Sequence, residues 1–154
     1  MPDFSVCMGC RLRPATQLDK TFLYRLHCLT MRHHIEATWG WDEAWQRNDF
    51  QHRFERYAIS VMEHDGVAIG SLWLEDRPTA VYIADIQVLP EWQERGIGTA
   101  VVRRVIADAL SRQLDVELAV LPVNERARSL YQRIGFVVTE VSDPFVYMRY
   151  RQHD

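Results

Sequence analysis

Long hydrophobic runs are missing from this sequence. Although 47% of its 154 residues are hydrophobic, no segment approaches the run of about 18 apolar residues that suggests a membrane-spanning helix. Residues 1–10 also lack a positively charged start followed by an apolar stretch, which are the features of a secretory signal peptide. We therefore expect a cytoplasmic protein that does not enter a membrane.

Cysteine is scarce as well, with Cys7, Cys10 and Cys28 as its only instances. An odd number in a chain without a secretion signal argues against a disulfide framework. Cys7 and Cys10 have the spacing of half a zinc site or of a redox pair, but no second CxxC follows, so we expect no metal site. We interpret residues 1–10 as an N-terminal extension with two free thiols, and residues 11–154 as a single domain.

Neither sign of charge dominates. The chain has 18 basic and 21 acidic residues, for a net charge of -3, and this balance argues against a nucleic-acid-binding surface. Internal repeats, low-complexity runs and Gly/Ser linkers are also missing, which favours one continuous domain.

The hydrophobic pattern predicts alternating strands and helices. Apolar residues recur every three to four positions in the expected helices and every second position in the expected strands, and Asp65-Gly66 is a strong hairpin signal. The expected elements are a strand at 11–16, helices at 18–35 and 42–56, a hairpin at 57–74, a strand at 80–89, a helix at 98–112, a strand at 116–121, a helix at 124–134, and strands at 136–141 and 145–150. This order, β-α-α-β-β-β-α-β-α-β-β, predicts an α/β fold with a mixed sheet and helices on both faces.

A pair of glycines lies between an expected strand and an expected helix. Residues 93–99 read Gln-Glu-Arg-Gly-Ile-Gly-Thr. Gly96 and Gly98 allow backbone N–H groups to approach a phosphate, and the helix start supplies further N–H groups. A Walker loop would require Lys at Thr99, and a dinucleotide fingerprint would require Gly or Ala at Val101. Both alternatives fail, and a diphosphate remains the natural ligand of these exposed N–H groups at a helix start.

Together with its surroundings, this loop resembles the acetyl-CoA-binding motif Q-x-x-G-x-G of the GNAT superfamily. Residues 86–91, Ile-Gln-Val-Leu-Pro-Glu, are similar to the strand and Pro-Glu turn that precede the motif. Residues 124–136 match the downstream signature N-x-x-A-x-x-L-Y-x-x-x-G-F. The resemblance covers residues 11–150 and implies a GNAT-type acyl-CoA N-acyltransferase fold. It also implies transfer of an acetyl group from acetyl-CoA to a primary amine of a small molecule or peptide, by direct attack in a ternary complex.

The resemblance implies acetyl-CoA as the co-substrate and no metal. In the family, the amides of the glycine loop hold the pyrophosphate, and Asn124 would both cap its helix and bond the pantetheine arm. The cofactor-binding residues implied in this way are Ile86, Gln87, Val88, Gln93, Glu94, Arg95, Gly96, Ile97, Gly98, Thr99, Asn124, Ala127 and Tyr131.

The reaction calls for a general base. A lysine-like amine has a pKa of about 10.4 and is neutral in about one part per thousand at pH 7, and only the neutral form attacks a thioester. Asp85 is the first candidate because the family often has an acidic residue there, with Glu36 and His34 as second choices. Asp85 fits equally well as a strand-end carboxylate paired with an arginine.

Tyr131 matches the family's general acid by position. A tyrosine with a pKa of about 10 can protonate a departing thiolate whose pKa is about 8.5. An aromatic residue that fills the helix face shared with Ala127 and Ile134 would look the same in sequence. The resemblance implies that a backbone N–H around Val88, where the family's strand bulges, stabilises charge on the thioester carbonyl.

In this family the segment that links the first two helices forms one wall of the acceptor site. Here that segment, residues 32–41, supplies His34, Trp39 and Trp41 as expected substrate contacts, because tryptophan faces bind cations and flat rings. The tryptophans fit equally well as anchors of the helix turn on the sheet. We expect Trp45 and Trp73 to lie in the core.

Other functions stay open at this point. A different acyl-CoA, an O-linked acceptor, or a domain that binds acetyl-CoA as a sensor without turnover would share these motifs, although the retention of Tyr131 favours an enzyme. The expected partner is a small-molecule or peptide amine rather than nucleic acid or membrane. The family resemblance allows a homodimer.

Overall fold

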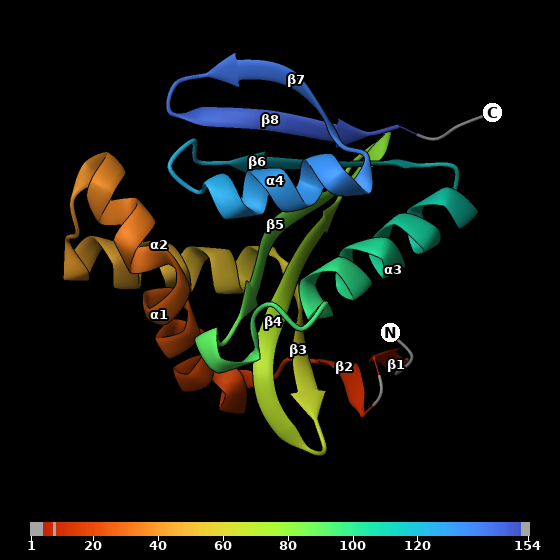
Figure 1. The fold of residues 1–154 in the computed structure, drawn as a ribbon. Helices are drawn as coiled ribbons and strands as arrows, with labels where there is room; N and C mark the ends of the chain where they lie inside the picture. Colours follow the sequence, from red (N-terminus) through yellow and green to blue (C-terminus); the bar gives the residue numbers. More distant parts are fainter. Residues whose placement is uncertain (1–4, 8, 152–154) are drawn as a thin grey trace.

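The computed structural model of the protein describes residues 5–7 and 9–151, which form one mixed sheet with helices on both faces (Figure 1). Eight strands lie in the order β1-β2-β3-β4-β5-β6-β8-β7, and only the pair β5 and β6 is parallel. The strands are β1 (Ser5–Cys7), β2 (Cys10–Pro14), β3 (Ala58–His64), β4 (Val67–Asp76), β5 (Ala80–Val88), β6 (Asp115–Val120), β7 (Val137–Ser142) and β8 (Phe145–Tyr150).

The helices divide the hydrophobic core between the two faces of the sheet (Figure 1). One face packs against α1 and α2 through a cluster that includes Leu23, Phe50 and Trp73. The other face packs against the apolar side of α3 and against α4. The helices are α1 (Lys20–Trp39), α2 (Glu43–Arg56), α3 (Ile97–Ser111) and α4 (Glu125–Ile134), with short 3-10 helices at Gln17–Asp19 and Pro90–Trp92. Within residues 5–7 and 9–151, no helix has the length and apolar character required to cross a membrane.

The α/β fold class is confirmed, and so is the predicted order of elements, which the short strand β1 precedes. The predicted helix at 18–35 instead continues to Trp39, because the glycine that ends it, Gly40, has a φ of 82°. Trp73 is buried as expected, but Trp45 is 59% exposed, so its expected place in the core is wrong. The physical reason is its position in the first turn of α2, on the side of the helix that faces a cleft rather than the sheet.

The N-terminal segment differs from its expected description. Cys10 begins β2, is 2% exposed and is disulfide-bonded, whereas Cys28 is a free thiol. The expectation of two free thiols in the extension is therefore wrong, because an odd number of cysteines still allows one pair. The domain boundary after residue 10 stays a prediction, although β1 pairs with β2 in the sheet.

Strands β5 and β6 separate soon after they meet. They pair only through Ala80–Ile83 and residues 115–118. On its other side, β5 has a bulge at Ala84, because Trp73 and Leu74 of β4 oppose Asp85 and Ile83. The resemblance had placed such a bulge around Val88, so that position is wrong. Since a bulge bends its strand, the second half of β5 leaves β6 and exposes backbone groups between the two strands.

Gly70 of β4 holds the end of β5 at close range. A Cβ atom at Gly70 would lie 2.4 Å from the carbonyl oxygen of Gln87 and 2.9 Å from the sulfur of Met62. Any larger residue would push the end of β5 away from β4. The close packing of this strand end against β4 therefore requires a glycine, which has no side chain, at position 70.

We expect Gly70→Ala to lower the free energy of unfolding by about 1–3 kcal/mol, the usual cost of overpacking a core. Urea denaturation followed by circular dichroism measures the change. Val67→Ala in the same strand is the control, because Val67 is 62% exposed and its truncation removes little packing. Equal unfolding midpoints for the two variants would contradict the role of Gly70.

Candidate active site

A cleft of about 320 Å³ opens where β5 and β6 separate. It collects side chains from both helical layers, with α4 on one side and α1 and α2 on the other. Its lining residues on the strand side and α4 are Tyr82, Ile83, Ala84, Asp85, Ile86, Leu118, Ala119, Val120, Leu121, Asn124, Ala127 and Tyr131. On the other side they are His27, Met31, Ile35, Trp39, Trp45, Gln46, Asp49, Arg53, Tyr57 and Phe145.

The predicted glycine loop forms the start of α3. Gly96 has a φ of 81°, and the first intrahelical bond runs from the N–H of Ala100 to the oxygen of Gly96 at 3.0 Å. The N–H groups of residues 97–99 therefore have no acceptor inside the helix. A Cβ atom at Gly96 would meet no atom within 4 Å, so the space beside the loop is open. Free N–H groups at a helix start are a binding site for an anion.

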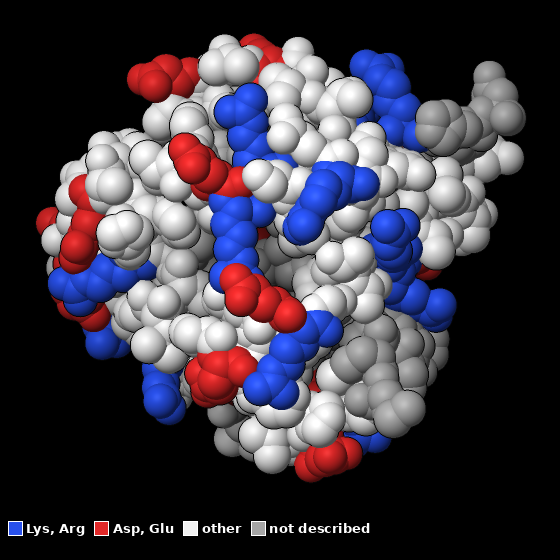
Figure 2. Space-filling model, in the orientation of Figure 1, with Lys and Arg blue, Asp and Glu red and all other residues white. Residues whose placement is uncertain are grey.

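Gln93 ties this loop to its neighbours. Its Nε2 donates to the carbonyl oxygen of Val88 at 2.9 Å, and its Oε1 accepts from Arg126 of α4 at 2.9 Å. Nη1 of Arg126 also lies 3.7 Å from Oε1 of Glu94, which makes an ion pair. Figure 2 shows basic and acidic side chains interspersed over the face that carries α3 and α4, without a broad patch of one sign. Both ends of the Gln93 side-chain amide therefore already have hydrogen-bond partners within the protein. The groups of the loop that remain available to an anion are its backbone N–H groups.

Asn124, Ala127 and Tyr131 of α4 face the cleft together. The predicted cap is confirmed, because Oδ1 of Asn124 accepts from the N–H of Ala127 at 3.3 Å. The Tyr131 side chain is 5% exposed and packs edge-on against Phe136 at 5.6 Å between ring centroids. Burial raises the pKa of Tyr131 above its usual value. Its hydroxyl therefore stays protonated at neutral pH, which a general acid requires.

Asp85 lies in the cleft and forms an ion pair with Arg53 of α2. The guanidinium of Arg53 lies 5.2 Å from the centre of the Trp73 ring, and burial lowers its pKa. Of the two interpretations of Asp85, the arginine pair is the one observed. A carboxylate beside an arginine is a weak base because the positive charge favours its ionised form. Its role as general base stays a prediction.

The remaining predicted residues are divided between the cleft and the surface. Trp39 lines the cleft, but His34, Glu36 and Trp41 do not. The Glu36 side chain is 46% exposed and accepts from Nε of Arg32 at 2.6 Å. The indole of Trp41 donates to Glu43 at 2.8 Å, at the turn between α1 and α2. The catalytic and substrate-binding roles of these residues stay predictions.

Most residues that line the cleft were missing from the predicted site, among them four side chains of α1 and α2 with polar or aromatic groups: His27, Trp45, Gln46 and Asp49. Nε2 of His27 lies 2.9 Å from Oε1 of Gln46, and burial lowers the pKa of His27, so the ring is neutral at pH 7. The four-residue spacing of a helix face could have indicated three of them, His27, Trp45 and Asp49. His27 lies on the stripe of α1 that ends at Trp39, and Trp45 and Asp49 lie on the stripe of α2 that ends at Arg53, because residues four apart share a helix face.

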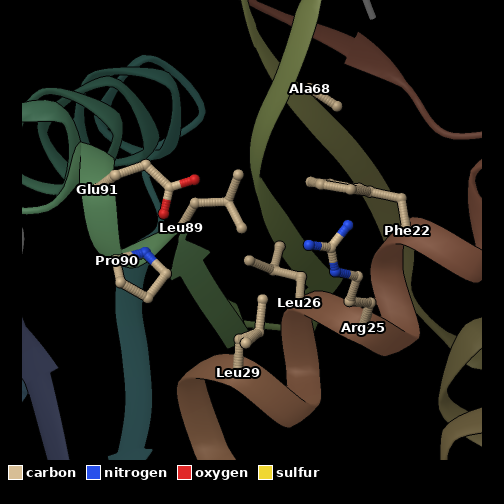
Figure 3. A pocket seen from close by; sticks show the side chains of 8 residues that line it. All are labelled: Phe22, Arg25, Leu26, Leu29, Ala68, Leu89, Pro90 and Glu91. Carbon is tan, nitrogen blue, oxygen red and sulfur yellow. The ribbon is translucent and has the colours of Figure 1, made fainter.

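A second cavity, of about 400 Å³, lies between α1 and the connection from β5 to α3 (Figure 3). Figure 3 shows leucines of α1 pointing toward Leu89 and Pro90. Among the described residues that line it, Arg25 and Glu91 are the charged ones, and the others are apolar. Elsewhere in the described part of the chain, no group of three or more His, Cys, Asp or Glu residues could hold a metal ion. We therefore place the chemistry in the first cleft.

Comparisons with known proteins agree on one family. The acetyltransferase (GNAT) family matches residues 21–136. Thialysine N-epsilon-acetyltransferase of Bos taurus is 39% identical over 56 residues, which are 36% of this chain and 33% of that protein, so the match spans a third of the relative's length.

Solved structures share the fold at low sequence identity. The PaiA N-acetyltransferase of Thermoplasma acidophilum in complex with coenzyme A superimposes with a TM-score of 0.76 at 15% identity, over 94% of this chain and 99% of that one. A GNAT family acetyltransferase of Elizabethkingia anophelis with acetyl-CoA bound gives a TM-score of 0.70 at 15% identity, over 93% and 98% of the chains. Because the family match covers more than half of the sequence, the chain belongs to the acetyltransferase (GNAT) family.

Proposed function

We propose that this protein is an N-acetyltransferase that transfers the acetyl group of acetyl-CoA to a primary amine of a small molecule or peptide. The proposal rests on the composition of the cleft. The cleft lies at the opening between β5 and β6, and it is lined by Tyr131 on one side and by residues of α1 and α2 on the other. Two substrates can therefore meet there from opposite sides. The relative named for acetylation of thialysine at N-epsilon agrees with an amine acceptor.

The residues present fit acetyl-CoA. The free N–H groups of residues 97–99 suit its pyrophosphate, since they join the positive end of the helix dipole. The amide of Asn124, at the start of α4, suits the pantetheine arm. When bound, acetyl-CoA supplies an activated acetyl group as a thioester.

The open edge of β5 supplies the expected donor to the thioester carbonyl. The N–H of Leu89 donates to the oxygen of Ile69 in β4 at 2.8 Å. Because successive residues of a strand turn their N–H groups to opposite sides, the N–H of Val88 faces the side of β6, where no strand pairs with it. A fixed, unpaired donor of this kind stabilises negative charge as it develops on a carbonyl oxygen.

Tyr131 has the properties of the acid that protonates the departing sulfur. Its hydroxyl makes no hydrogen bond with the described residues, and its ring is fixed by Phe136. The amine must also lose a proton before it attacks. With Asp85 paired to Arg53, that proton leaves through water or through another group of the cleft.

Thiol release from acetyl-CoA tests the function. The purified protein is incubated with amines, polyamines, aminoglycosides, amino acids and peptides with free N-termini. We expect release that depends on the acceptor, with a mass gain of one acetyl group on one class. Binding of acetyl-CoA without release across the panel would instead indicate a sensor.

Tyr131→Phe should lower kcat by about 10²-fold, the usual contribution of a general acid, with little change in affinity for acetyl-CoA. In the wild type, the raised pKa of Tyr131 should prevent loss of kcat up to about pH 10, the ordinary tyrosine pKa. Tyr147→Phe on β8 is the control, because Tyr147 does not line the cleft. An unchanged kcat in Tyr131→Phe would remove its role as acid.

Gly96→Val should abolish acetyl-CoA binding, measured by calorimetry, because the new side chain occupies the open space through which a phosphate reaches the loop. Gly66→Val is a matched control. Both glycines have a φ of 81°, and a Cβ atom at either would meet no atom within 4 Å. Both variants therefore carry the same backbone strain, but Gly66 lies in the β3–β4 turn. Wild-type affinity in Gly96→Val would disprove the assignment of the loop.

A further inference from the structure

The acceptor side of the cleft has two unusually exposed tryptophans. Trp39 is 58% exposed and Trp45 is 59% exposed, although both line the cleft. Large aromatic surfaces in water favour contact with an apolar or flat partner. They come from different helices, the end of α1 and the start of α2. The two rings therefore border the cleft from neighbouring elements and leave their surfaces available to a ligand.

A third aromatic ring lines the cleft beside Trp39. Phe145, at the start of β8, lies 5.9 Å from Trp39 between ring centroids, at an interplanar angle of 53°. This contact joins the end of α1 to the turn between β7 and β8. A ligand that enters beside it meets aromatic walls on both sides.

The charge of the cleft is negative. Its charged lining residues are Asp49 and Arg53 on this side and Asp85 on the strand side, and Arg53 forms an ion pair with Asp85. Asp49 makes no hydrogen bond or ion pair with the described residues. His27, which faces the same space from α1, is neutral because burial lowers its pKa. Asp49, whose charge also acts on Arg53, therefore offers a carboxylate without a hydrogen bond or ion pair among the described residues, one helical turn from Trp45 on the same face of α2.

We infer that the acceptor is a small primary amine with a flat aromatic group, an arylalkylamine, whose ring contacts Trp45 and Trp39 and whose ammonium group lies by Asp49. This inference rests on the proposed function. Tryptophan faces attract both flat rings and cations, and a free carboxylate selects a cation over a neutral analogue.

Other acceptors fit less well. A polyamine has several cationic groups, but among the described lining residues only Asp49 is an unpaired carboxylate. A polypeptide needs room on this side of the cleft for the rest of its chain, and the contact between Trp39 at the end of α1 and Phe145 at the start of β8 occupies part of it. An anionic acceptor would be repelled by Asp49.

The transfer balances with these groups. The amine nitrogen forms a bond to the acetyl carbon while the carbon–sulfur bond breaks. The ammonium group loses two protons in all. One leaves through Asp49 to water, and the other restores the proton that Tyr131 gives to the sulfur. The products are the N-acetylated amine, the free thiol and one proton.

The test compares matched amines at saturating acetyl-CoA. We expect kcat/KM for 2-phenylethylamine and tryptamine to exceed that for n-hexylamine, which lacks a ring, by about tenfold or more, the size of effect that aromatic and cation–π contacts produce. Spermidine, lysine and a short peptide are measured in parallel. Equal values for n-hexylamine, or a preference for spermidine, lysine or the peptide, would overturn the inference.

Two variants assign the preference to its residues. Trp45→Ala should raise KM for 2-phenylethylamine about tenfold, leave KM for n-hexylamine nearly unchanged, and be rescued by Trp45→Phe, which keeps a ring. Asp49→Asn should raise KM for 2-phenylethylamine by about tenfold or more, without weakening inhibition by the uncharged 2-phenylethanol. Asp108→Asn, on α3 and 57% exposed, is the control for loss of charge. If Trp45→Ala raises KM equally for 2-phenylethylamine and n-hexylamine, Trp45 does not contact the aromatic ring of the acceptor.

Separate binding measurements distinguish this inference from the proposed function. Calorimetry with acetyl-CoA tests the function, and quenching of tryptophan fluorescence by 2-phenylethylamine tests the acceptor site. Acetyl-CoA binding with acetylation of spermidine or a peptide alone would keep the function and overturn the aromatic acceptor. Saturable quenching that Trp45→Ala and Asp49→Asn weaken, without thiol release, would support the ring site while the function fails.

Discussion

The separation of β5 from β6 is the constraint on which the site depends. The two strands pair over four residues each, and the bulge at Ala84 then bends β5 away. Buried backbone groups almost always find hydrogen-bond partners, so a sheet opened in this way favours a ligand that supplies them. The same opening gives the buried Tyr131 a place in the lining of the cleft. A sheet paired along its whole length would have no such space.

The pair formed by Arg53 and Asp85 joins α2 to the strand that leaves the sheet. This ion pair holds α2 beside the opening between the strands, on the side of the cleft opposite α4. The cleft is thereby divided into a side formed by the separated strands and α4 and a side formed by α1 and α2. In the function proposed above, this division lets one small domain hold its two reactants on opposite sides of the cleft.

Local patterns explain why so much of the fold could be predicted. Asp42, Asn124 and Gly135 cap or end helices where the sequence indicated a boundary, because capping depends on one residue and the backbone beside it. The position of the bulge and the exposure of Trp45 were wrong, since both depend on which strand or helix lies opposite. Pairing of Cys10 was missed for a similar reason, because the number of cysteines does not show which of them approach each other.

The family resemblance, the order of elements, the helix that begins at the glycine loop and the cap at Asn124 could all be inferred from the sequence alone. These features rest on hydrogen bonds and periodicity within a few residues. Only the folded structure shows that Asp85 is paired with Arg53, that Trp39 faces the cleft while Trp41 does not, and that Asp49 forms no ion pair with the described residues. These facts depend on groups far apart in the chain, because a side chain's charge and exposure are set by whatever folds against it.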